Sequence, residues 1–106
     1  MTFNKQFSDS ELRQISDEAL LYMCACPAQV AAQLLQLRKL YAYQANCRAD
    51  PENDPAVHGA IAAATADAHA VFEACLEKVL TLEGWDRATL TMPEGLRQKR
   101  DLLLGD

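Results

Sequence analysis

Apolar residues recur at helical spacing along the first quarter of the chain. Ser8 and Glu11 stand three residues apart, which is typical of a capping box at a helix start. The apolar positions that follow are separated alternately by three and four residues, so they share one helix face. These positions are Leu12, Ile15, Ala19, Tyr22 and Cys26. The pattern predicts an amphipathic helix that begins near Ser8.

Pro27 interrupts this pattern and leaves two interpretations. Because proline lacks an amide hydrogen and disfavours helical geometry at the preceding residue, a first helix can end near Cys24 or Ala25, and a second can begin with Pro27 in its first turn. The apolar spacing nevertheless continues through Cys26 to Tyr41 without a slip, so one kinked helix is the rival interpretation. We favour the break, with the second helix running over residues 27–48.

A polar turn at residues 49–54 precedes a third, long helix. Asp54 followed by Pro55 is typical of a helix N-terminus, and Gly84 is typical of a residue that ends a helix. The apolar positions between them again alternate by four and three until the last turns. They are Val57, Ile61, Ala64, Ala68, Val71, Cys75, Val79 and Leu82. The short turn predicts that the two long helices form an antiparallel hairpin, and we expect this stripe to be the face that the hairpin buries.

Trp85 and the C-terminal residues are expected to cover the end of the hairpin. Trp85 either packs back onto the end of the third helix or forms an exposed anchor for a partner, and we favour packing. Thr91, Pro93 and Glu94 predict a last short helix over residues 93–104.

Composition supports one all-α domain over residues 1–106, a bundle of three to four helices built on the hairpin. Strong helix formers dominate, whereas Val, Ile and Thr are sparse, so a sheet is not expected. The net charge of −5 and the lack of a basic stripe argue against nucleic acid or an anionic membrane as partner. No stretch has the apolar length of a membrane span or of a signal-peptide core, which predicts a cytoplasmic protein.

The apolar surface is expected to be wider than two helices can shield. Either four short segments form a monomeric bundle, or two hairpins pair into a four-helix homodimer, and we favour the homodimer. The alanine-rich run at residues 60–70 fits either high helix propensity or a tight seam between helices.

Cysteines supply the most interesting candidate chemistry. Antiparallel pairing is expected to bring Cys75 near Cys24 and Cys26, while Cys47 lies at the opposite end of the hairpin. Free thiols usually behave as small buried apolar groups. A redox pair is the second interpretation, because a helix start at Cys26 stabilises a thiolate. A zinc or copper(I) site is the third, although Cys-x-Cys spacing and a missing fourth ligand argue against it.

Other polar groups are predicted to be structural. Thr65, His69 and Glu73 share one helix face at four-residue spacing, and we interpret them as a solvated polar stripe. Phosphate-binding loops, dinucleotide-binding glycines, nucleophile elbows and zinc-protease motifs are absent from the sequence. We therefore predict no cofactor and a non-enzymatic helical interaction or accessory protein that presents a helical surface to a protein partner. The alternative is a thiol-based redox or metal-binding protein.

Overall fold

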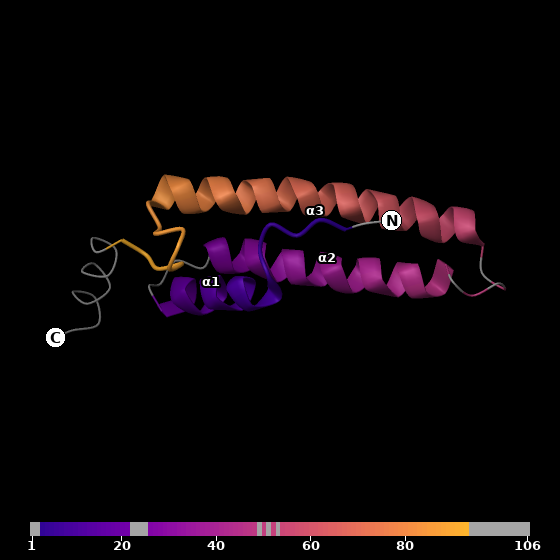
Figure 1. Ribbon diagram of the computed structural model, residues 1–106, viewed down its shortest axis with the longest axis horizontal. Helices are drawn as coiled ribbons and strands as arrows, with labels where there is room; N and C mark the ends of the chain where they lie inside the picture. The colour runs from indigo at the N-terminus through magenta and orange to yellow at the C-terminus, as the bar shows by residue number, and fades with distance from the viewer. Residues whose placement is uncertain (1–2, 22–25, 49, 51, 53, 94–106) are drawn as a thin grey trace.

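The described part of the chain folds into three helices, of which the outer two pack against the middle one. The computed structural model describes residues 3–21, 26–48, 50, 52 and 54–93. Helix α1 spans Asp9–Leu21, α2 spans Cys26–Arg48 and α3 spans Pro55–Glu83 (Figure 1). Helix α2 contacts both α1 and α3, and no strand occurs among the described residues. The prediction of an all-α bundle on a long hairpin is confirmed.

The start of α1 has the capping box that its sequence predicts. The Ser8 amide donates to Glu11 Oε1 at 2.9 Å, and the Glu11 amide donates to Ser8 Oγ at 3.0 Å. These reciprocal bonds satisfy two backbone donors that a helix start leaves without partners. The same start turns the apolar face of α1 onto the rest of the molecule, and its buried residues are Leu12, Ile15 and Ala19.

The chain reverses direction between α1 and α2, as the break interpretation requires. Helix α2 begins at Cys26 and has Pro27 in its first turn, where proline is tolerated. Asp9 at the start of α1 forms an ion pair with Arg38, well inside α2. Helix α1 therefore runs back along α2 instead of continuing its axis through a kink.

Local signals also set both ends of α3. The Asp54 side chain accepts a hydrogen bond from the Ala56 amide at 2.9 Å, and Pro55 follows it as the first helical residue. At the other end Gly84 has a φ of 76°, a left-handed conformation that glycine adopts without steric cost. The Trp85 amide then donates to the Leu80 carbonyl at 2.9 Å, which is the outer bond of a Schellman motif.

The hydrophobic core lies at the end of the hairpin away from the α2–α3 turn. There α1, the first half of α2, the last turns of α3 and residues 85–92 meet (Figure 1). The largest fully buried apolar side chains of this core are Phe7, Leu12, Ile15, Leu34, Leu76 and Leu80. Near the α2–α3 turn only two helices are present, and Ala62 is the one buried apolar residue in the described first half of α3.

The prediction that the hairpin buries the apolar stripe of α3 is wrong. The stripe from Val57 to Leu82 is largely exposed, and the relative exposure of Val71 is 67% and that of Leu82 is 75%. The helix instead turns a mixed face inward. The buried residues of that face are Ala62, Thr65, His69, Glu73, Leu76 and Leu80. Both faces repeat at helical spacing, so periodicity alone does not distinguish them.

Residues 85–93 form a closed turn that ties α3 to α1. Asp86 and Thr91 pair in an isolated bridge, and Asp86 Oδ1 accepts from the Ala88 and Thr89 amides at 2.9 and 3.1 Å. Gln14 on α1 donates to the Thr89 carbonyl at 2.8 Å. The predicted helix over residues 93–104 lies almost wholly outside the described residues. Among the helices described, none has the length and apolarity that crossing a membrane requires.

Candidate functional site

A buried polar cluster around Arg38 occupies the middle of the hairpin. The Arg38 side chain donates from Nε to His69 Nε2 at 3.0 Å, from Nη1 to Asp9 Oδ1 at 2.5 Å, and from Nη2 to Glu73 Oε2 at 3.2 Å. Nη2 also donates to the Phe7 carbonyl oxygen at 2.6 Å. One guanidinium group therefore joins α1, α2, α3 and the residues that precede α1. A buried charge needs this degree of hydrogen bonding to be tolerated.

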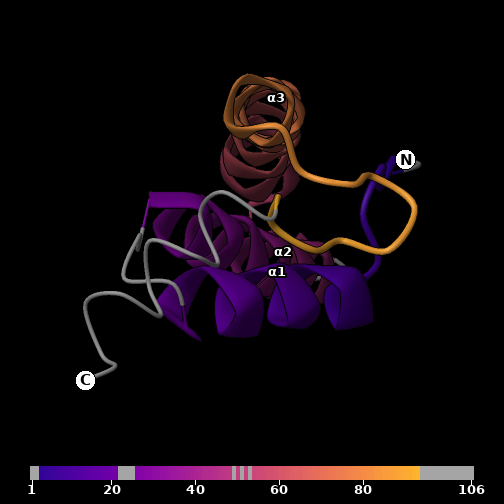
Figure 2. The ribbon, with the colours of Figure 1, turned by 90° about the vertical axis from the view of Figure 1, so that its left-hand side faces the viewer.

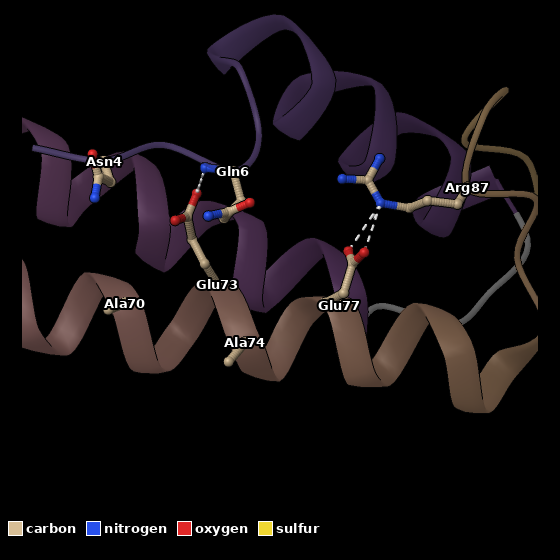
Figure 3. Close-up of a pocket in the computed structure, with 7 residues that line it drawn as sticks. All are labelled: Asn4, Gln6, Ala70, Glu73, Ala74, Glu77 and Arg87. Carbon is tan, nitrogen blue, oxygen red and sulfur yellow. Dashed lines mark hydrogen bonds and ion pairs between the residues drawn. The ribbon is translucent and has the colours of Figure 1, made fainter.

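Glu73 holds the N-terminal segment (residues 3–8) against α3. Its Oε2 accepts from the Gln6 amide at 2.7 Å (Figure 3). It also accepts from the Phe7 amide at 3.2 Å. The side chain is 4% exposed, so the Arg38 charge compensates its own. Upstream of this contact, Phe3 stacks on Tyr41 with ring centroids 4.3 Å apart and lies equally close to the His69 ring. The segment is thus bound at both of its ends.

His69 is held as the neutral tautomer with its proton on Nδ1. Because Arg38 Nε is always a donor, His69 Nε2 must accept and cannot carry a proton. Burial is the largest cause that holds the pKa of His69 below its ordinary 6.5, and the positive charges of Arg38 and Lys5 act in the same direction. Glu73, whose Oε1 lies 3.6 Å from His69 Nδ1, opposes this shift. A protonated ring would direct a second N–H at Arg38.

Asp9 is the second carboxylate that pairs with Arg38. The hydrogen bond from Arg38 is the largest cause that holds the pKa of Asp9 below its ordinary 3.8, and it outweighs the opposing effect of desolvation. The Asp9 side chain is 47% exposed, so water screens this pair more than it screens the Arg38–Glu73 pair.

The prediction of a solvated Thr65, His69 and Glu73 stripe is wrong. Their relative exposures are 4%, 1% and 4%. The spacing of the three residues was visible in the sequence, but their burial depends on Arg38, a single charge in an otherwise apolar row of α2. A buried arginine needs hydrogen-bond acceptors on the facing helix. This requirement could have indicated that His69 and Glu73 are buried, but hydrophobic periodicity does not take it into account.

The Arg38 cluster is built to hold structure and is not built for catalysis. His69 is almost completely buried, and its Nε2 is occupied by Arg38, so a substrate cannot reach it. Beside the cluster is a cavity of about 390 Å³, whose lining residues are Asn4, Gln6, Ala70, Glu73, Ala74, Glu77 and Arg87 (Figure 3). Its charged groups already have partners, since Arg87 Nε donates to both Glu77 carboxylate oxygens at 3.1 and 2.9 Å.

The predicted thiol site receives no support from the described residues. Cys26 and Cys75 are exposed thiols, and Cys47 is half-buried; none of the three forms a disulfide. Cys24 lies outside the described residues. Within the described part of the chain, no group of three or more His, Cys, Asp or Glu residues could hold a metal ion. The redox and zinc or copper(I) interpretations of Cys24, Cys26 and Cys75 therefore stay predictions.

Trp85 lies in the hydrophobic core, with a relative exposure of 7%. Its Nε1 donates to Glu83 Oε1 at 2.9 Å. This position suits the packing interpretation of Trp85 better than that of an exposed anchor.

The exposed apolar stripe of α3 is the remaining candidate site. We define the open stripe as Val57, Ile61, Ala64, Ala68, Val71, Cys75, Val79 and Leu82. Six of these residues are exposed, and Ala68 and Val79 are half-buried. Residues 3–8 and 85–93 both pass along one side of α3 (Figure 2), and the described residues leave most of the open stripe uncovered. An apolar surface of this length is typical of an interaction site.

Comparisons of the chain with protein-family models, with curated proteins and with solved structures give no match.

Proposed function

We propose that this chain is a non-enzymatic helical interaction module that works as a homodimer and uses the open stripe as its subunit interface. The observation that carries the proposal is the inverted placement of the two faces of α3. The helix buries Thr65, His69 and Glu73 while it leaves Val57, Val71 and Leu82 more than half exposed. Burying one valine or leucine side chain completely contributes about 1.5–3 kcal/mol relative to leaving it in water. A partner surface that covers the exposed side chains would gain this free energy.

The shape of the molecule agrees with an unfilled interface. The Cα atoms have a radius of gyration of 17.2 Å, whereas a compact domain of this length has about 13 Å. A second hairpin on the open stripe would supply the layer that the turn half of the hairpin lacks, and the result is a four-helix arrangement.

Sedimentation equilibrium of the full chain at micromolar concentration tests this proposal. We expect a dimer, and Val71→Glu should weaken it at least tenfold, because each tenfold change needs only about 1.4 kcal/mol. Ala63→Glu is the matched control, since Ala63 is also an exposed α3 residue but lies outside the open stripe. Both variants should keep the helical circular dichroism of the native chain. A native chain that sediments as a monomer at these concentrations contradicts the proposal.

A further inference from the structure

The spacing of the open stripe matches a seam between paired helices. From Val57 to Cys75 its members are separated alternately by four and three residues, the repeat at which two helices pack along their length. Ala64 and Ala68 lie in the first half of the stripe, where small side chains allow close approach of a second backbone, and larger residues lie toward both ends. We propose that the occupant of the open stripe is the α3 helix of a second copy, packed antiparallel, with the two-fold axis passing between Ala68 and Val71.

This inference rests on the proposed homodimer and adds the orientation of its subunits. A two-fold axis at that position brings Val57 of one chain beside Leu82 of the other. It also brings Ala64 beside Cys75 of the second chain. Every member of the stripe then lies against the same stripe of the second copy, as an isologous interface requires.

Charge complementarity selects the antiparallel orientation. Asp67 and Lys78 are both exposed, and they lie four residues before and seven residues after Val71. Helical geometry therefore places both of them on the outer edge of the open stripe. In an antiparallel pair with this axis, Asp67 of each chain and Lys78 of the other lie on the same edge of the seam, offset by about 9 Å along the helix axis, so the opposite charges attract each other without being level. A parallel pair would bring identical charges level with one another, which is unfavourable.

The uneven thickness of the molecule favours the same orientation. Helix α1 and residues 85–93 gather at the end of the hairpin away from the turn, while the turn end contains only α2 and α3 (Figure 1). Antiparallel packing places the thick end of each copy beside the thin end of the other. Parallel packing would bring the two thick ends together.

The interface has sufficient area when α2 contributes to it. The stripe is about 38 Å long at a rise of ~1.5 Å per residue. One helix face about 10 Å wide gives roughly 400 Å² per copy, half of the ~800 Å² typical of a stable complex. Leu37 and Leu40 on α2 lie on the face turned away from the N-terminal segment, and Leu40 is 41% exposed. We assign the second half of the interface area to the flank of α2 that carries these two residues.

Disulfide trapping distinguishes the orientations. The starting protein keeps Cys75 as its only thiol through Cys24→Ser, Cys26→Ser and Cys47→Ser. In this background Ala64→Cys should give a covalent dimer upon oxidation by copper phenanthroline, with the disulfide joining the introduced thiol to Cys75 of the other chain. Residues 64 and 75 of one helix are about 16 Å apart, so this disulfide cannot form within one chain. Peptide mass spectrometry identifies the linked positions.

The control is Ala63→Cys in the same background, which should not give a covalent dimer because residue 63 lies outside the stripe. A Cys75–Cys75 disulfide in the single-thiol protein would indicate parallel helices and overturn the antiparallel orientation, although the homodimer would stand. The absence of a cross-link from Ala64→Cys in a protein that sediments as a dimer also overturns it. A monomer in sedimentation overturns both proposals and assigns the stripe to another occupant.

A charge exchange gives an independent readout. Lys78→Glu should weaken dimerisation about two- to fivefold at low salt, because exposed ion pairs contribute modestly. Adding Asp67→Lys to the same chain should restore the native dissociation constant. An unchanged dissociation constant in Lys78→Glu would remove the charge argument for the antiparallel orientation.

Discussion

Replacing Arg38 with methionine should destabilise the fold strongly. The guanidinium donates to three groups of little or no exposure, namely His69 Nε2, the Glu73 carboxylate and the Phe7 carbonyl oxygen. Methionine keeps the apolar part of the side chain but leaves Glu73 charged and buried. Asp9 contributes less to the loss because its half-exposed carboxylate can be solvated.

The expected loss follows from the burial of the Arg38–Glu73 pair. Removing one partner of a buried ion pair costs about 3–5 kcal/mol. Because small domains have total stabilities of about 5–15 kcal/mol, the variant would lose a large fraction of its stability. The melting temperature should fall by at least about 12 °C.

Urea unfolding followed by circular dichroism measures this loss, at one protein concentration because the proposed dimer would contribute to stability. Lys39→Met is the matched control, since Lys39 is the exposed neighbour and should change the free energy of unfolding by less than about 0.5 kcal/mol. The double variant Arg38→Met with Glu73→Gln should lose less than the two single losses added together, because the two residues are in contact. A loss below about 1 kcal/mol in Arg38→Met would refute the structural role of the cluster.

Three further outcomes follow from single features. The pKa of His69 is below its ordinary 6.5 in the folded state, so at lower pH the unfolded chain binds more protons than the folded one. The free energy of unfolding should therefore be unaffected by His69 above pH 6.5 and should decrease as the pH falls from there toward the lowered pKa. Urea unfolding of the native chain and of His69→Gln across this range measures the effect, and a slope that persists in the variant contradicts it. Gly84→Ala should cost about 1–2 kcal/mol, because alanine is strained at a φ of 76° although its Cβ would meet Pro93 Cγ only at 3.8 Å. Asp54→Ala should cost about 1 kcal/mol by removing the cap of α3, and Asp54→Asn, which can still cap, should recover most of it.

Features that depend on neighbouring residues were predicted from the sequence, and features that depend on distant residues were not. The ends of α3 follow from Asp54 and Gly84, because a cap side chain or a left-handed glycine acts within one turn of the helix. The buried face of α3 depends instead on Arg38, which is 35 residues from Glu73 along the chain. Hydrophobic periodicity located both faces of the helix but did not show which of them meets α2.

The same distinction between local and distant residues applies to the candidate functional residues. The Cys26 and Cys75 thiols attracted attention because their chemistry is apparent from the residue type alone. The Arg38 cluster did not, since an arginine on α2 and a histidine on α3 acquire their roles only when the two helices pack. The Arg38 cluster was not predicted, and the apolar stripe of α3 was predicted to be buried. Both errors have one cause, because the rotation of α3 about its own axis decides which of its faces meets α2.

The polar contacts between α2 and α3 also decide how the two helices are aligned along their length. Toward the turn the inner face of α3 consists of small side chains such as Ala62 and Thr65, so apolar packing in that half would oppose sliding only weakly. Arg38 pairs with His69 and Glu73, and Gln44 Oε1 lies 2.6 Å from His58 Nδ1 nearer the turn. Sliding one helix by a turn, about 5.4 Å, would separate both sets of partners and leave buried polar atoms without hydrogen bonds. The polar residues of the seam thus exclude misaligned hairpins that would bury nearly the same apolar area.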